Sequence, residues 1–314
     1  MIYVLGNINK EVLLEVPRLP KKDEAVSAES CRTCLGGKGA NQAIAIAKLG
    51  RRDDVDKKTV ALIGKIGDDG VGAELKARLD DYGVDTEFVR SANRSTGVVF
   101  VTSTGKDSRI VHYGGANNML SKTDVDEALE NASEGDTLLC QLESPLYVVA
   151  YALRKAKQLG MTTILNPSPA KELPDDLYYN VDIIVPNRAE TKKLVGIDPS
   201  DESSKEEAIR RFHEKGVQHV VITLGKGGAI ISDGHRLVGQ NIPRHKVTPI
   251  DTTCAGDTFV GALALTYPHV GMYSFKEACL FATRAAALCI TKQGAAESVP
   301  SFEEVLELYN NIIG

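Results

Sequence analysis

Short apolar runs alternate with longer amphipathic stretches along most of this chain. The apolar runs are rich in Val, Ile and Leu, as expected for strands buried on both faces of a sheet. They lie at 2–8, 59–67, 137–142, 162–168, 182–187 and 219–225, and stretches with helical spacing include 146–159, 188–195 and 203–215. This alternation predicts an α/β fold with a mainly parallel central sheet covered by helices on both faces. Right-handed crossovers would collect ligands along the edge formed by the carboxyl ends of the strands.

Two segments follow a different pattern. Residues 10–35 and 93–113 alternate apolar and polar positions with a period of two, as in "TGVVFVTSTGKDSRIVHY". This spacing predicts antiparallel strands outside the main sheet. They form either a small β-sheet lid over the ligand edge or an ordinary extension of the main sheet. Because no internal repeat, low-complexity stretch or flexible linker divides the chain, we expect a single domain over 1–314.

Composition and charge exclude several classes of partner. The 314 residues carry 37 basic and 42 acidic side chains, a net charge of −5, so no basic field favours nucleic acid or an anionic membrane. The opening residues lack the features of a signal peptide, and no uncharged apolar run is long enough to span a bilayer. We therefore expect a cytoplasmic protein whose six cysteines stay reduced. Cys31 and Cys34 form a C-x-x-C pair without the partners that a zinc site needs.

Neither of the familiar glycine-rich nucleotide signatures, G-x-x-x-x-G-K-[ST] and G-x-G-x-x-G, occurs in the chain. Four other stretches are unusual instead. The first, "GGKGANQ" at 36–42, precedes a helical pattern that is closed by Gly50. Its glycines allow a close approach of the backbone to a ligand, while Lys38 and Asn41 add polar groups at a helix N-terminus. A tight glycine turn is the alternative interpretation.

The second and third stretches each follow an apolar strand. In "PNRAE", at 186–190, Asn187 and Glu190 have the spacing of a capping box, and this alone explains both residues. The functional alternative is that they hold phosphate, water or Mg²⁺ at the end of the strand. In "TLGKGG", at 223–228, backbone N–H groups either cradle a phosphate or simply reverse the chain between two strands.

The fourth stretch, "DTTCAGDTF" at 251–259, gives the sharpest signal. The apolar spacing that follows it predicts the start of a helix, whose N-terminus carries unpaired N–H groups and partial positive charge. Gly256 leaves the N–H groups of residues 255–257 open to a phosphate. A simple N-cap does not require the Ala-Gly step. We therefore expect the carboxylate of Asp257 to act beside a bound anion.

Taken together and in order, these motifs resemble the ribokinase (PfkB) family of sugar kinases. "GGKGANQA" and "DTTCAGDTFVGAL" match the two signatures of the family, and "LESP", "NPSPAKELPD", "PNRAE", "ITLGKGG" and "KQGAAESVP" follow the family order over nearly all of 1–300. The resemblance implies a three-layer αβα sandwich with a small β-sheet lid. It also implies transfer of the γ-phosphoryl group of ATP to the 5-hydroxyl of D-ribose, with Mg²⁺ and K⁺ as cofactors. Deoxyribose, another sugar or a nucleoside as acceptor, and a non-catalytic sugar-binding regulator, stay open as alternatives.

The resemblance also assigns roles to individual residues. Asp257 is the implied catalytic base, beside an anion hole at Ala255 and Gly256. The implied sugar-binding residues are Asn9, Glu11, Gly37, Lys38, Asn41, Glu143 and Asp257. The implied nucleotide-binding residues are Asn187, Thr223, Gly225, Gly228, Gly256 and Thr283. The implied monovalent-cation residues are Asp251, Thr253, Cys289, Lys292, Gly294 and Ser298, and Asn187 and Glu190 are implied in binding Mg²⁺ indirectly.

Two positions depart from the family pattern. The family usually reads Asn-x-Asp after the first strand, whereas this chain reads Asn9-Lys10-Glu11, and the longer acid either shifts the loop or changes the preferred sugar. Cys254 stands where the family has small residues. A thiol near a helix N-terminus can have a lowered pKa and be prone to oxidation, but packing is the simpler interpretation. The lid also implies a homodimer, because pairing two lids covers an exposed edge and face.

Overall fold

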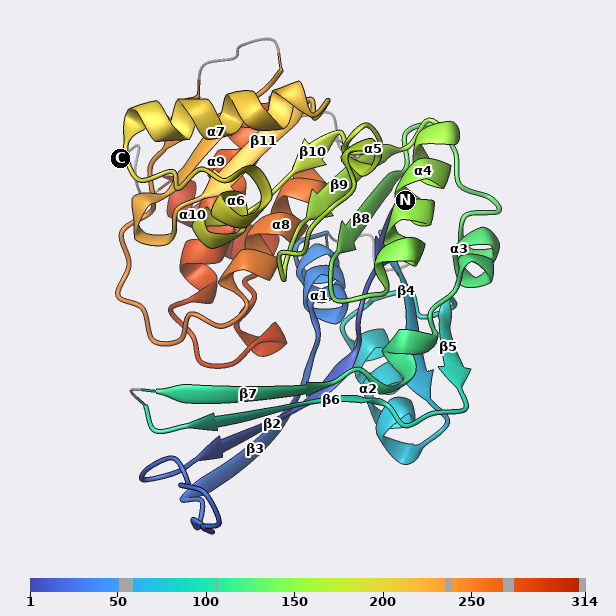
Figure 1. Ribbon diagram of the computed structural model, residues 1–314, viewed down its shortest axis with the longest axis vertical. Coiled ribbons are helices and arrows are strands. Elements are labelled where there is room, and N and C mark those ends of the chain that lie inside the picture. The colour runs from blue at the N-terminus through green and yellow to red at the C-terminus, as the bar shows by residue number, and fades with distance from the viewer. Residues whose placement is uncertain (51–58, 106, 235–238, 268–273, 311–314) are drawn as a thin grey trace.

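The computed structural model describes residues 1–50, 59–105, 107–234, 239–267 and 274–310. Within them lie a large sheet and a small sheet (Figure 1). The large sheet has the strand order β13-β12-β11-β10-β9-β8-β1-β4-β5. Its strands are β1 (Ile2–Leu5), β4 (Val60–Gly67), β5 (Val89–Ala92), β8 (Thr137–Gln141), β9 (Thr162–Asn166), β10 (Ile183–Ile184), β11 (His219–Thr223), β12 (Ala229–Ser232) and β13 (Gln240–Ile242). All neighbours pair in parallel except at β12, which is antiparallel to both β11 and β13.

Helices cover both faces of the large sheet. They are α1 (Lys38–Gly50), α2 (Gly70–Asp81), α3 (Lys122–Ala128), α4 (Leu146–Gln158), α5 (Asp175–Tyr178), α6 (Arg188–Val195), α7 (Glu202–Glu214), α8 (Ala255–Thr266), α9 (Phe275–Cys289) and α10 (Phe302–Asn310). Side chains of β1 alternate between two cores, because successive residues of a strand point to opposite faces. Ile2 and Val4 pack with α1, α2, α8, α9 and α10, whereas Tyr3 and Leu5 pack with α3, α4, α5 and α7. The predicted three-layer α/β architecture is therefore confirmed.

Most element bounds agree with the predicted ones to within two residues, but β1 and β10 each end three residues before the predicted end, β10 at Ile184 rather than 187. We predicted a strand over 2–8, but β1 ends at Leu5. A Cβ on Gly6 would lie 2.6 Å from the Cα of Gly39, so the chain after Leu5 passes directly against the first turn of α1. This contact, rather than any loss of apolar character, ends the strand. None of the helices in the described part of the chain combines the length and apolar character needed to cross a bilayer.

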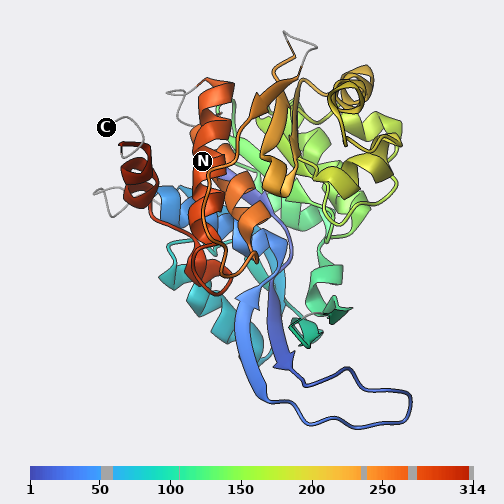
Figure 2. The same cartoon turned by 90° about the vertical axis from the view of Figure 1, so that its left-hand side faces the viewer.

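The small sheet contains β2 (Asn9–Glu15), β3 (Ser30–Gly36), β6 (Gly97–Ser103) and β7 (Ser108–Tyr113) in the order β3-β2-β6-β7. Its strands come from the two segments with period-two alternation. The prediction that these strands are antiparallel is wrong at one pairing, since β2 and β6 run parallel. Both strands leave the large sheet and extend in the same direction, whereas β3 and β7 return to it. The hairpin of β2 and β3 projects from the body of the molecule (Figure 2).

Helices α1 and α8 approach each other closely. At their contact, a Cβ on Gly261 of α8 would lie 2.8 Å from the Cβ of Ala45 and 3.0 Å from the backbone oxygen of Gln42. Glycine is therefore the residue that permits this spacing. The close packing brings the N-terminus of α1, with its glycine-rich motif, beside the N-terminus of α8.

Candidate active site

Asp257 lies in the first turn of α8, 7% exposed, and the turn before it is strained. Cys254, the N-cap residue, has φ of 64°, a left-handed conformation that favours glycine. Of the three N–H groups predicted to be open, that of Ala255 donates to the Thr252 carbonyl at 3.5 Å, whereas those of Gly256 and Asp257 have no hydrogen-bond acceptor among the described residues. A Cβ on Gly256 would meet nothing within 4 Å. Two unpaired donors therefore face open space at the positive end of the α8 dipole.

Three residues of α1 converge on the Asp257 carboxylate. Asn41 donates its side-chain amide to Oδ2 at 3.1 Å, and Gln42 donates to Oδ1 at 3.0 Å. The Nζ of Lys38 lies 3.9 Å from Oδ1. Asn41 and Asp257 are 216 residues apart in sequence, so the contact depends on the close packing of α1 and α8. The two signature motifs thus form one cluster.

A second carboxylate faces the same lysine. Glu143, which follows β8, accepts a hydrogen bond from the backbone N–H of Lys38 at 3.0 Å. Burial raises the pKa of Glu143, although the N–H and ammonium groups of Lys38 oppose this shift. The pKa of Lys38 is raised chiefly by Asp257, with further contributions from Glu143 and Glu190. Lys38 therefore stays cationic among three acids.

Two buried polar atoms in this cluster are unsatisfied. Asn9 is 1% exposed and its Oδ1 accepts a bond from Asn117 at 2.9 Å, but its Nδ2 has no partner in the described part of the chain. The Oδ1 of Asn41, which is 6% exposed, lacks one too. Buried polar groups are nearly always paired, so a free donor and a free acceptor mark a place for a polar ligand. Gly37, with φ of 92°, lets the chain turn tightly beside Asn9.

Glu11 lies on the same face of β2 as Asn9. Burial raises the pKa of Glu11, the backbone N–H of Gly37 opposes this, and the charges of Glu143 and Asp257 add to it. A Cβ on Gly36 would lie 2.0 Å from Oε1 of Glu11, so the long acid depends on that glycine. A hollow of about 260 Å³ extends from Glu11. Its other lining residues include Arg32, Cys34, Asp251, Thr253, Gly294 and Glu297.

The predicted nucleotide residues lie largely together along the carboxyl ends of β10 and β11. Asn187 forms an isolated parallel bridge with Thr223. Asn187 and Glu190 form a reciprocal capping box, with bonds of 2.7 and 2.9 Å between each side-chain oxygen and the other backbone N–H group. Gly225 and Gly228 have φ of 55° and 83° in the turn that follows. Thr283 lies apart on α9, where its hydroxyl donates to the Cys279 carbonyl at 2.8 Å.

The predicted monovalent-cation residues come from two segments that Asp251 joins. Its carboxylate accepts bonds from the N–H groups of Thr253 at 2.9 Å and Gly294 at 3.1 Å. Cys289 contacts both segments, since its Sγ lies 3.8 Å from the Thr253 carbonyl and 3.1 Å from the Ser298 hydroxyl. The side chain of Lys292 instead points to Glu304, at 2.6 Å. The described residues hold no group of three or more His, Cys, Asp and Glu side chains suited to a metal.

The surroundings of Cys254 bear on the two interpretations of its thiol. Its thiol is 8% exposed and packs with Ala45, Cys289, Ala295 and Val299. A hydrogen bond with Cys289, together with burial, raises the pKa of Cys254 well above its usual value. The lowering that a helix N-terminus can produce is therefore absent, because the thiol points into the packed cluster. The packing interpretation fits this geometry.

Sequence reasoning missed the amide network behind Asp257. Gln42, Gln141 and Asn166 are all buried and hydrogen-bonded to one another, directly or through Gln42. The available signal was a glutamine inside an otherwise apolar helix. Asn117, which anchors Asn9, and His112, whose charge lowers the pKa of Glu143, were also missed. These contacts cross between distant segments and leave no local pattern.

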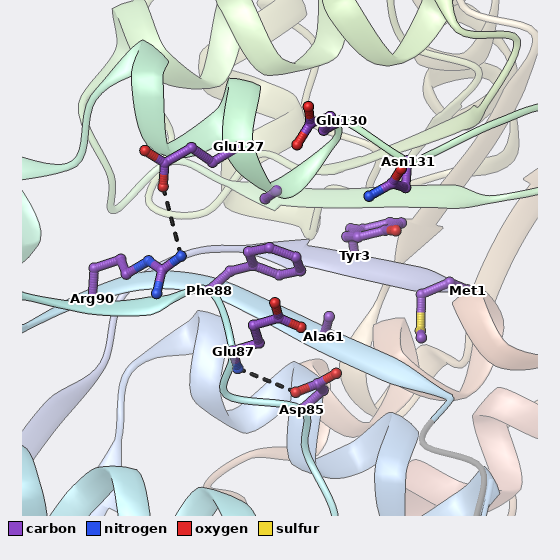
Figure 3. Close-up of a pocket in the computed structure, with 11 residues that line it drawn as sticks. Met1, Tyr3, Ala61, Asp85, Glu87, Phe88, Arg90, Glu127, Glu130 and Asn131 are labelled. Carbon is purple, nitrogen blue, oxygen red and sulfur yellow. Dashed lines mark hydrogen bonds and ion pairs between the residues drawn. The ribbon is translucent and has the colours of Figure 1, made fainter.

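A separate hollow of about 400 Å³ lies at the amino ends of β1 and β4 (Figure 3). Tyr3 and Phe88 form part of its wall, with their ring centroids 6.4 Å apart, and Arg90 lies 3.7 Å from Glu127. The candidate residues gather at the opposite, carboxyl ends of the strands. This hollow therefore does not belong to the candidate site.

Comparison with known proteins agrees with this geometry. Residues 1–301 match the model of the pfkB family of carbohydrate kinases. The ribokinase of Haemophilus influenzae is 38% identical over 308 residues, covering 98% of this chain and 97% of that protein. The deoxyribokinase of Salmonella typhi is 32% identical over 312 residues, with coverage of 98% and 97%. The structure of Arabidopsis thaliana ribokinase complexed with ribose and ATP matches with a TM-score of 0.86 at 32% identity, covering 98% of this chain and 97% of that one.

Proposed function

Because the chain belongs to the pfkB family of carbohydrate kinases, we propose that it transfers the γ-phosphoryl group of ATP to the 5-hydroxyl of D-ribose, giving ribose 5-phosphate and ADP. One observation carries the proposal. Lys38 and Asn41 of α1 converge on Asp257 of α8, beside two N–H groups that have no acceptor among the described residues. This combines a positioned carboxylate with an anion site.

Asp257 accepts the proton of the sugar hydroxyl as the new O–P bond forms. A carboxylate is a weak base toward a sugar hydroxyl, so orienting the hydroxyl matters as much as removing its proton. The N–H groups of Gly256 and Asp257, with the α8 dipole behind them, stabilise charge on the transferred phosphoryl group. Loss of one such donor typically costs about 10²–10³ in rate.

Sugar recognition rests on complementary polar atoms. The free Nδ2 of Asn9 donates to a hydroxyl, and the free Oδ1 of Asn41 accepts from one. Glu143 and Glu11 add carboxylate acceptors beside them. Glu11 is one methylene longer than the aspartate usual in the family. This residue favours one alternative, a kinase that prefers 2-deoxyribose, as the name of the Salmonella typhi relative describes.

Two cofactors fit the donor chemistry. Mg²⁺, which would neutralise phosphate charge, would be held with ATP near Asn187 and Glu190, through water. K⁺ would be held by oxygen atoms of the segments that Asp251 joins, 251–253 and 289–298. The oxygen donors there suit a hard cation rather than a thiolate-binding metal. Asp251 supports the K⁺ proposal because its carboxylate holds the two segments together and takes no part in the cluster around Asp257.

The small sheet serves as a lid and as a dimer interface. Phe100, Val111 and Tyr113 are 44%, 65% and 46% exposed, and the pairing of β6 with β7 puts them on one face. That face is opposite the one carrying Asn9 and Glu11. A second copy of the sheet would cover this apolar face. The six free thiols are consistent with a single-domain enzyme working in the reducing cytoplasm.

The test measures initial rates of ADP release with MgATP. Ribose, 2-deoxyribose, fructose and adenosine are compared, each in K⁺ and in Na⁺. We expect ribose to give the highest kcat/KM and K⁺ to accelerate it. A higher kcat/KM for another acceptor would replace ribose while leaving the kinase chemistry intact. No ADP release with any acceptor, from protein that still binds ATP, would favour the non-catalytic regulator.

Replacement of Asp257, the proposed base, gives a second test of the function. Asp257→Asn keeps the size of the side chain and removes its basicity, so kcat falls by about 10³-fold or more while sugar binding persists. Asp126→Asn on α3, where Asp126 accepts a hydrogen bond from Tyr151 at 2.7 Å, is the control and keeps the parent rate. Equal rates for Asp257→Asn and the parent would remove Asp257 from the reaction.

A further inference from the structure

Gln42 is a polar side chain in a fully buried position. It is 0% exposed on α1, between Asn41 and Ala43, and faces α8 and the large sheet. Burial of an amide is costly unless its hydrogen bonds are made. Gln42 makes all of them. Its Nε2 donates to Asp257 Oδ1 at 3.0 Å and to Asn166 Oδ1 at 3.1 Å, and its Oε1 accepts from Gln141 Nε2 at 2.7 Å.

The network fixes which end of Gln42 meets the carboxylate. The carboxylate of Asp257 and the Oδ1 of Asn166 can only accept, so the NH₂ group of Gln42 must point toward them. The Oε1 of Gln42 accepts from Gln141, on β8, whose own Oε1 has no partner among the described residues. Asn166, on β9, takes the second NH₂ hydrogen and is itself held by its bond to the Val185 carbonyl at 2.8 Å. A Cβ on Gly6 would lie 2.2 Å from the Oε1 of Gln141, so this glycine admits the glutamine. Gln141 of β8 and Asn166 of β9 thereby orient the side-chain amide of Gln42.

We propose that Gln42 is a positioning residue, which fixes the orientation of Asp257 and leaves Oδ2 as the oxygen that accepts the proton. Oδ1 accepts the Gln42 bond and faces the Lys38 ammonium at 3.9 Å. A carboxylate oxygen that faces a cation and a donor is the less basic of the two. Among the described residues, Oδ2 accepts a bond only from Asn41, whose own Oδ1 is buried and has no partner there. The substrate hydroxyl therefore meets Oδ2.

This inference rests on the proposed kinase function. The test distinguishes failure of the inference from failure of that function. Gln42→Leu removes the donor at nearly constant volume. We expect kcat to fall by about 10- to 100-fold with KM for the sugar changing less than threefold, because binding groups stay in place while the base turns. The measurement uses whichever acceptor of the panel the parent enzyme phosphorylates best, so failure of ribose alone does not affect it.

Gln42→Glu gives a readout that a purely structural role would not move. It places a second carboxylate against Asp257, and two acids in contact share a proton, which raises one pKa. The titratable groups that already face Asp257 are Lys38, Glu143 and Glu11, together with the thiols of Cys254 and Cys289. We expect the acidic limb of the kcat–pH profile to move upward by about one unit or more relative to the parent.

The control is Thr163→Val on β9, the strand that also carries Asn166. Thr163 is buried, and its hydroxyl donates to Asp182 Oδ2 at 3.0 Å, outside the Asp257 cluster. Its loss lowers Tm but leaves kcat unchanged. The proposal is overturned if folded Gln42→Leu and Gln42→Glu proteins keep the parent kcat and pH profile, or if a rise in KM accounts for all lost activity. If neither Gln42 variant folds, Gln141→Leu is measured instead. A several-fold fall in kcat at unchanged KM would support the proposal, and kinetics equal to those of the parent would overturn it.

Discussion

At the scale of single residues, the site is built from groups that look ordinary in sequence. Lys38 and Asn41 were predicted to bind a ligand because they stand in a glycine-rich motif before a helix. Their approach to Asp257 depends on the packing of α1 on α8 and could not be read from either motif. The free atoms of Asn9 and Asn41 were equally invisible, since a residue type does not reveal which of its hydrogen bonds are made.

Cys254 carries a conformational cost that can be measured. A φ of 64° costs an L-residue about 1–2 kcal/mol. Glycine at this position avoids that cost, but the greater flexibility of its unfolded chain cancels about 0.4–1 kcal/mol of the gain. Cys254→Gly and Cys254→Ala both remove the thiol, so their comparison isolates the backbone. We expect the glycine variant to be more stable by about 0.5–1 kcal/mol in urea unfolding. A more stable alanine variant would contradict the strain.

The raised pKa of Glu11 makes the free energy of unfolding depend on pH in a predictable direction. Burial raises its folded pKa above the unfolded value, so its contribution to stability is present at low pH and lost as pH rises through the folded pKa. Glu11→Gln has no such titration. We expect the variant to exceed the parent in free energy of unfolding at pH 8 and this excess to disappear at pH 4, measured in urea. An excess that grows toward pH 4 would mean that the folded pKa is lowered instead.

At the scale of elements, the sequence predicted most strands and helices to within two residues, because continuous apolar runs and helical spacing are local signals. The start of α8 was predicted at its observed place for the same reason. The parallel pairing of β2 with β6 was not, because the partner of a strand is chosen by chain path rather than by period. The spacing of Asn187 and Glu190 did predict their capping box, which the structure confirms, because this motif is a local signal.

At the N-terminus of α8, one substitution is expected to change stability and activity in opposite directions. Alanine suits a helix better than glycine by up to about 1 kcal/mol, and a Cβ at position 256 meets nothing within 4 Å in the protein alone. Gly256→Ala is therefore expected to raise the stability by about 0.5 kcal/mol. The same methyl group occupies the space over the free N–H groups, so kcat falls by roughly 100-fold. Thermal unfolding and ADP release measure both, and an unchanged kcat would remove the anion hole from this turn.

At the scale of the whole molecule, the small sheet extends from the body of the chain (Figure 2), and the apolar side chains Phe100, Val111 and Tyr113 on its outer face are exposed. Val111→Asp places a charge in this face, so the proposed dimer dissociates at micromolar concentration in light scattering. Tyr147→Asp, at a position 60% exposed on α4, is the matched control and leaves the mass unchanged. A monomeric parent protein would contradict the dimer directly.

Among the described residues, the strands of the small sheet connect to the rest of the chain along one edge. Asn9, Gly36 and Gly97 stand side by side where β2, β3 and β6 meet the body, and Gly114 follows β7 on the same row. Glycine has the greatest backbone freedom, so this row is the axis about which the proposed lid would turn. The displacement of the sheet would grow with distance from the row, and Glu15 lies about 20 Å along β2 from Asn9. A sugar would then enter under the far edge while Asn9, on that axis, keeps its place.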